Sequence, residues 1–243
     1  MELSASETGG LDNLVIFDID GTLTKTNAVD CSCYAQAVED VLGVSGFSTD
    51  WGDYRHSTDV GILEEIVATR CGRVASQRDV RTVRRRFIEL VEEERRRIGQ
   101  FEQVDGAAEM LRALPALGWR WAIATGGWEP SARCKLESAG IGSASAALAT
   151  AEDAFARTDI IAWAIRRAAP ATEATSMARV YVGDGRWDVE AARASGCGFV
   201  GIGHGERALR LVEAGAKAVL PDFRDQARFV EALREASVEQ RAR

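Results

Sequence analysis

The stretch Leu14-Val15-Ile16-Phe17-Asp18-Ile19-Asp20-Gly21-Thr22-Leu23-Thr24 decides the interpretation of the whole chain. Its first four residues form a short apolar run, typical of a buried parallel strand that delivers polar residues at its carboxyl end. Two carboxylates at i and i+2 can converge on one cavity where the chain begins to turn, so that one serves as nucleophile and the other transfers protons. The alternative is an Asx-rich turn with a purely backbone role. A calcium loop is excluded because the remaining EF-hand ligand spacing is absent.

Three later segments have the same strand character, each followed by a turn rich in Gly, Ser, Thr or Asp. They are Trp119 to Ala124, Val180 to Val182, and Phe199 to Ile202. Helical patterns separate them, which predicts an α/β fold: a Rossmann-like parallel sheet core with helices on both faces. Such sheets bind ligands outside the carboxyl ends of their strands.

Residues 27–99 differ, because their pattern is helical without a convincing strand. We expect helices over Ala28 to Leu42, Asp59 to Thr69 and Arg78 to Arg97, which form an inserted all-helical domain; residues 11–26 and 100–235 then form the core. We call residues 27–99 the helical insert. Arginines and glutamates alternate in blocks along its last helix, which favours a solvated face of ion pairs over a nucleic-acid patch.

Composition limits the classes of function. The chain has 243 residues, a formal charge of -7 and 46% hydrophobic residues, typical of a globular protein without attraction to nucleic acid or anionic membranes. No apolar run reaches the length of a membrane span and the first ten residues do not look like a signal peptide, so we expect a cytoplasmic protein. Five scattered cysteines suit a reducing compartment, and a zinc site is disfavoured because the chain has two histidines and no CxxC pair.

The octapeptide Phe17 to Thr24 resembles the first motif, DxDGT, of the haloacid dehalogenase-like superfamily in its phosphatase form. The resemblance implies that Asp18 is the nucleophile and Asp20 the general acid and base. It also implies a small hydroxyl residue at the end of a later strand, and Thr125 stands there, followed by Gly126 and Gly127. Glycine permits close backbone approach, so these amides and the Thr125 hydroxyl can bind phosphate oxygens; a threonine that merely ends a strand is the alternative.

The segment Gly183 to Asp188 resembles the fourth motif of that family, GDxxxD. Hard Mg²⁺ prefers oxygen ligands. The resemblance implies that Asp184 contacts Mg²⁺ together with Asp18 and the carbonyl of Asp20, and that Asp188 supports these ligands. Acids at a helix N-terminus, stabilised by the helix dipole, are the alternative interpretation.

The third motif departs from the family pattern, which usually places a lysine upstream of the fourth motif. Arg157 is the candidate for that catalytic cation because its distance before Asp184 fits, although arginine does not replace lysine freely. Lys135 is the alternative, in the predicted helix after Thr125.

These residues predict a magnesium-dependent phosphatase that hydrolyses a small phosphorylated metabolite through an aspartyl-phosphate. The resemblance extends over the core, and the helical insert looks like the cap of phosphoglycolate phosphatase and related enzymes. Its polar and aromatic segment Trp51 to Asp59 suggests substrate contacts from Tyr54, Arg55 and His56, although the same segment can simply cap a helix. His204 follows a strand in a glycine-rich turn without dinucleotide-binding spacing.

Three alternatives remain at this level. A phosphomutase would use the same aspartyl-phosphate, and a ligand-sensing protein could keep the fold without turnover. A dehalogenase is disfavoured because it needs neither Asp20 nor a metal. We expect a monomer or a small homo-oligomer.

Overall fold

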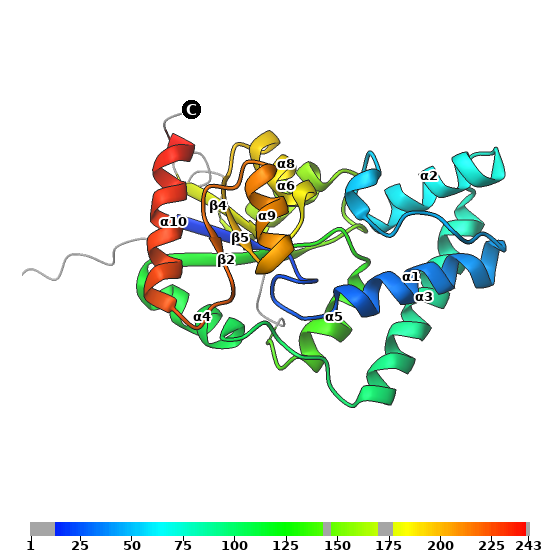
Figure 1. The fold of residues 1–243 in the computed structure, drawn as a ribbon, viewed down its shortest axis with the longest axis horizontal. Coiled ribbons are helices and arrows are strands. Elements are labelled where there is room, and N and C mark those ends of the chain that lie inside the picture. The colour runs from blue at the N-terminus through cyan, green and yellow to red at the C-terminus, as the bar shows by residue number, and fades with distance from the viewer. Residues whose placement is uncertain (1–12, 143–146, 170–176, 242–243) are drawn as a thin grey trace, which may run out of the picture.

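A computed structural model describes residues 13–142, 147–169 and 177–241 (Figure 1). Its centre is a six-stranded parallel sheet in the order β3-β2-β1-β4-β5-β6. The strands are β1 (Asn13–Phe17), β2 (Trp119–Ala124), β3 (Ala147–Ala149), β4 (Ala178–Gly183), β5 (Gly198–Ile202) and β6 (Val219–Leu220). The chain adds strands first on one side of β1 and then on the other, so β1 pairs with both β2 and β4. The predicted Rossmann-like α/β fold is confirmed, and β1 lies at the switch point where such sheets bind ligands.

Helices cover both faces of the sheet, as predicted. They are α4 (Ala107–Ala113), α5 (Glu129–Ser138), α6 (Arg157–Ala168), α8 (Arg186–Ala194), α9 (Gly205–Glu213) and α10 (Gln226–Arg241), with a 3₁₀ turn η2 (Leu114–Leu117) after α4. Alternate residues of β1 separate two apolar clusters: Val15 and Phe17 pack with residues of α4, α5 and α10, and Leu14 and Ile16 pack with residues of α6 and α8. Burial on both faces explains the continuous apolar run in the sequence.

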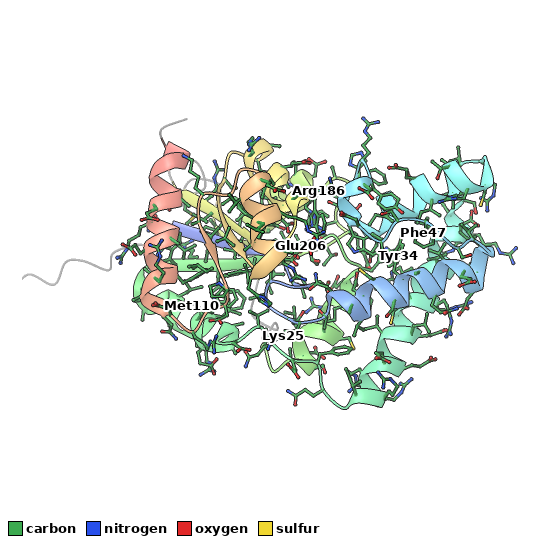
Figure 2. The ribbon with its side chains drawn as sticks, viewed as in Figure 1. Lys25, Tyr34, Phe47, Met110, Arg186 and Glu206 are labelled. Atoms are coloured by element: carbon green, nitrogen blue, oxygen red, sulfur yellow. The ribbon has the colours of Figure 1, made fainter. Side chains whose placement is uncertain are left out.

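The helical insert folds around an apolar cluster of its own. It contains α1 (Asn27–Leu42), the 3₁₀ turn η1 (Trp51–Asp53), α2 (Asp59–Cys71) and α3 (Gln77–Ile98). Tyr34, Phe87 and Trp128 are buried at its centre, and Trp128 comes from the core. Figure 2 shows Tyr34 on α1 and Arg186 where the core faces the insert. Shared aromatic packing therefore joins the insert to the core beside the carboxyl end of the sheet.

Two features of the insert's helices follow from local sequence. Helix α3 begins with a capping box in which Ser76 and Asp79 bond each other's backbone amides, and its predicted surface ion pairs form, for example between Arg97 and Glu94.

Within the described ranges, none of the helices combines the length and apolar character that a membrane crossing requires.

Strands β3 and β6 have no counterpart in the sequence prediction. They contain three and two residues, too few for a periodic pattern, and both lie at the edges of the sheet. Their ladder pairing with β2 and β5 defines them, which is information that a local pattern does not contain.

Candidate active site

The ends of three neighbouring strands bring the predicted motifs together. Strand register aligns Phe17 with Ile123 of β2 and with Val182 of β4, so the residues that follow these strands share one edge of the sheet. The amide of Asp18 donates to the carbonyl of Val182 at 2.9 Å. Asp18, Thr125 and Asp184 are each at least nine-tenths buried there.

Asp18 is a buried carboxylate with one cationic partner. Burial, followed by the nearby charge of Asp188, raises the pKa of Asp18 well above its usual range, and the guanidinium of Arg157 opposes this rise. The Arg157 Nη1 lies 3.1 Å from Asp18 Oδ1. Asp18 therefore needs positive charge nearby to stay ionised as a nucleophile.

Arg157 connects the core to the helical insert. Its Nη1 donates to Asp18 and Asp188, each at 3.1 Å, and to the hydroxyl of Tyr181 at 3.2 Å. Its Nη2 donates to the carbonyl of Ser57 in the insert at 2.8 Å, and its Nε to the Ser57 hydroxyl at 3.3 Å. The structure thus places Arg157 against the predicted nucleophile.

Lys135, the alternative cation, lies beside the second carboxylate. Its ammonium is 2.8 Å from Asp20 Oδ2 and also forms a short contact with Asp30 Oδ1. The other oxygen of Asp20 accepts from the Thr26 hydroxyl at 2.5 Å. Burial works against the charged form of Lys135, but Asp20 and Asp30 outweigh it and raise the pKa of this ammonium. The two cations are thus distributed between the two carboxylates of the first motif.

Asp18, Asp184 and Asp188 form an acidic group suited to a hard cation. One carboxylate oxygen from each lies within 4.8 Å of the others. Asp184 Oδ1 is buried and has no hydrogen-bond partner, an arrangement that costs free energy unless a cation or water is bound there. Its Oδ2 accepts from Asn27 at 3.0 Å and lies 3.1 Å from Arg207. Burial, then Asp188, raises the pKa of Asp184 to about 7.

Asp188 is already saturated with hydrogen bonds. Its Oδ2 accepts from the amides of Asp184 and Gly185 at 3.1 and 3.0 Å, and its Oδ1 accepts from Arg157 and Tyr181. All-oxygen donors fit Mg²⁺. Asp18 and the free oxygen of Asp184 are suited to direct contact with such an ion, whereas Asp188 is suited to hold the loop that carries Asp184. The carboxylate of Asp20 points to Lys135 instead, which leaves only its carbonyl for a metal.

Thr125, Gly126 and Gly127 line the cavity above Asp18. A Cβ on Gly126 would lie 2.4 Å from the Ser57 carbonyl oxygen, so only glycine allows the insert to approach this turn. The Gly126 carbonyl accepts from the amide of Asp59 at 2.8 Å. The loop at residues 57–59 of the insert is thus hydrogen-bonded to the core over the site.

The cavity has a volume of about 40 Å³. Besides the predicted residues, its lining includes Trp51, Ser57 and Asp59 from the segment that the sequence singled out, and four residues that it did not: Asn27, Asp30, Ile62 and Trp187. Asp30 and Asp59 are buried acids of the insert, and burial raises the pKa of both, that of Asp30 to about 6. Local sequence gave no signal for Asp30, which is one acid within an ordinary helical pattern, whereas Asp59 ends the segment Trp51 to Asp59 that the sequence singled out.

Tyr54, Arg55 and His56 do not line this cavity. The Tyr54 hydroxyl donates to the Ser48 carbonyl at 2.7 Å, Arg55 is exposed, and the His56 ring packs on Phe155 with 4.8 Å between centroids. The segment also caps a helix, as the alternative interpretation predicted. The Thr58 side chain accepts a hydrogen bond from the amide of Gly61 at the start of α2. Their role in substrate binding stays a prediction.

Comparisons with known proteins identify the family and the fold. The family model described as haloacid dehalogenase-like hydrolase matches residues 13–196. A search of curated protein sequences found no match. The fold is similar to that of a hydrolase from Pseudomonas syringae, with 21% identity, a TM-score of 0.72, and 90% of this chain and 98% of that chain covered.

Two other solved structures share the fold at low identity. A predicted phosphoglycolate phosphatase from Haemophilus somnus is 18% identical with a TM-score of 0.64, covering 91% of this chain and 99% of that chain. A mutant of CbbY from Rhodobacter sphaeroides, in complex with xylulose 1,5-bisphosphate, is 19% identical with a TM-score of 0.60. The match covers 88% of this chain and 95% of that chain.

Proposed function

The chain belongs to the haloacid dehalogenase-like hydrolases, and from this premise we propose that it is a magnesium-dependent phosphatase acting on a small phosphomonoester. The observation that carries the proposal is the buried Asp18 carboxylate, with Arg157 on one side, Asp184 and Asp188 on another, and Asp20 two residues away. Phosphoryl transfer depends mainly on positioning and charge stabilisation, and this set provides both.

The reaction follows from the two carboxylates. Asp18 attacks phosphorus in line to form an aspartyl-phosphate, while Asp20 gives a proton to the departing alkoxide oxygen. Asp20 then takes a proton from the water that attacks the aspartyl-phosphate, which releases inorganic phosphate and restores the Asp18 carboxylate. Two steps replace one very slow hydrolysis.

The remaining residues hold the reactants. When bound, Mg²⁺ supplies charge neutralisation for the phosphate oxygens and for Asp18. Arg157 favours the ionised form of Asp18 against the effect of burial and holds its carboxylate in place through its hydrogen bond. Thr125 and the amides at Gly126 and Gly127 bind phosphate oxygens, and the docked insert excludes water from the cavity.

The cavity lining indicates the class of leaving group. Arg157 is the only Lys or Arg among the lining residues that the structure describes, and two carboxylates of Asp18 and Asp188 engage it. Asp30 and Asp59 face the same space. We therefore expect esters whose leaving group is small and carries hydroxyl or amino groups to be hydrolysed faster than esters with a second anionic group, such as phosphoglycolate. The xylulose 1,5-bisphosphate bound by CbbY supports a phosphorylated small molecule as the general class, although that ligand carries the second anionic group that the lining of this cavity disfavours.

The test is phosphate release from a panel of small phosphomonoesters, with and without Mg²⁺, by the wild type and by Asp18→Asn. Asp159→Asn, an exposed aspartate in the first turn of α6, is the matched control. Metal-dependent release that Asp18→Asn abolishes and Asp159→Asn keeps would support the proposal. No release by folded wild type across the panel would refute it, and isomerised phosphate esters among the products would identify a mutase.

A further inference from the structure

Lys135 is a buried cation in a chain that otherwise relies on arginine. The sequence has three lysines among its 30 basic residues. The Lys135 side chain, from α5, is 1% exposed, and its ammonium lies between Asp20 and Asp30 and 5.8 Å from the centre of the Phe87 ring. A lysine ammonium is a compact charge with three rotatable donors, which suits a buried position between the two carboxylates.

Stability alone does not account for this cluster. Desolvating three ionised groups is expensive, and well-packed apolar residues in place of a buried ion group are often at least as stable. One cation with two acids also leaves excess negative charge. The cluster contains the acid/base carboxylate Asp20, whose side chain is 19% exposed, whereas Lys135 and Asp30 are nearly sealed.

Both oxygens of Asp20 have a fixed donor. Lys135 donates to Oδ2 at 2.8 Å and Thr26 to Oδ1 at 2.5 Å, and the Thr26 hydroxyl is 2.5 Å from that of Thr24. Thr24 and Thr26 are buried. Two donors on opposite oxygens define the plane of a carboxylate, and proton transfer needs that carboxylate within hydrogen-bond reach of the reacting oxygen.

We propose that Lys135, anchored by Asp30 of the helical insert, is a positioning residue that holds the Asp20 carboxylate in the orientation for proton transfer. The inference rests on the proposed phosphatase function. Asp30 belongs to α1 and Lys135 to α5. Lys135 therefore contacts both Asp20 and Asp30 only while α1 of the insert is packed against the core. Lys135 itself does not touch the substrate.

The test compares two substrates that need proton donation to different degrees. An alkyl phosphate has an alkoxide leaving group that must be protonated, whereas nitrophenolate leaves without help. We expect Lys135→Met to lower kcat/KM for the alkyl ester at least about tenfold more than for p-nitrophenyl phosphate, out of the 10²–10⁴-fold that general acid catalysis typically contributes. Equal losses for both substrates would show a merely structural role and overturn the proposal.

A double-mutant cycle gives an independent readout. If Lys135 acts through Asp20, then Lys135→Met added to Asp20→Asn changes alkyl-ester kcat/KM by less than about threefold, because residues in one network are not additive. Full additivity would overturn the proposal. Lys217→Met, at an exposed lysine before β6, is the control and should keep wild-type kinetics.

A second variant guards against loss of the fold. Asp30→Asn keeps the shape and an acceptor for Lys135, and we expect the same selective loss on the alkyl ester, smaller in size. Circular dichroism and thermal melting check that each variant is folded. If the wild type releases no phosphate at all, the proposed function fails; if it is active and neither Lys135→Met nor Asp30→Asn shows substrate-selective loss, only this inference fails.

Discussion

Replacement of Arg157 by methionine tests the electrostatics of the site most directly. Methionine fills much of the same volume but removes the guanidinium that lies 3.1 Å from both Asp18 and Asp188, leaving two buried carboxylates without their cation. Removing one partner of a buried pair typically costs about 3–5 kcal/mol. We expect the free energy of unfolding of the metal-free protein to fall by about that amount, and kcat/KM to fall about 10²–10³-fold, the usual cost of removing one preorganised donor.

Arg157→Lys separates the charge from the hydrogen bonds to the insert. One ammonium can stay near Asp18 and Asp188, but it cannot also reach the Ser57 carbonyl and hydroxyl. A hydrogen bond to a charged group contributes about 1.5–3 kcal/mol, so we expect a stability loss near one such bond, together with a raised KM and a kcat within about tenfold of the wild type. This pattern would assign the family's lysine role to Arg157.

The assay is urea unfolding with and without MgCl₂, combined with steady-state kinetics on the best substrate of the panel. Arg166→Met, an exposed arginine of the same helix stacked on Trp163, is the control. Mg²⁺ should reduce the stability loss of Arg157→Met because a second cation then compensates the carboxylates. The reasoning is refuted if Arg157→Met keeps kcat/KM within about threefold and unfolds at the wild-type urea concentration.

Three further predictions concern the glycine turn and the metal site. Gly126→Ala should raise KM at least about tenfold, because its Cβ would lie 2.4 Å from the Ser57 carbonyl oxygen, whereas Gly127→Ala, whose nearest contact is 3.6 Å, should have a smaller effect; equal KM values for the two variants would contradict this. Asp184→Asn should weaken Mg²⁺ binding measured by calorimetry by at least about tenfold, since a hard cation prefers a carboxylate, and unchanged affinity would exclude Asp184 as a ligand. Burial raises the pKa of Asp184 from 3.8 to about 7, so the folded metal-free protein holds a proton that the unfolded chain has lost between these two values. The melting temperature without Mg²⁺ should therefore fall between about pH 4 and pH 7 and level off above, and the gain on adding Mg²⁺ should grow over the same range. A gain that is constant with pH would refute this linkage.

The sequence by itself determined the architecture and the first carboxylates of the site. Apolar runs ending in polar residues predicted four of the six strands, and the parallel arrangement predicted that Asp18, Thr125 and Asp184 would meet at one edge. Such prediction succeeds because each of these residues directly follows its own strand, so position in the chain fixes position in space.

Only the tertiary structure determined which carboxylate each of the two cations contacts. Arg157 and Lys135 were rival candidates for one role, yet Arg157 bonds Asp18, 139 positions away, and Lys135 bonds Asp20, 115 positions away. The same holds for Asp30, which lines the cavity although its helical pattern carries no sign of it.

The physical reason is the range of the interactions. A local pattern defines which face of a helix is apolar, but the partner of a buried charge depends on how α5, α6 and the insert pack against one another. Tyr54, Arg55 and His56 illustrate this limit, because their composition suggests a binding loop while packing directs them to Ser48, solvent and Phe155. The sequence therefore determines which groups are present at the ends of the strands, and tertiary packing determines which charge each of them meets.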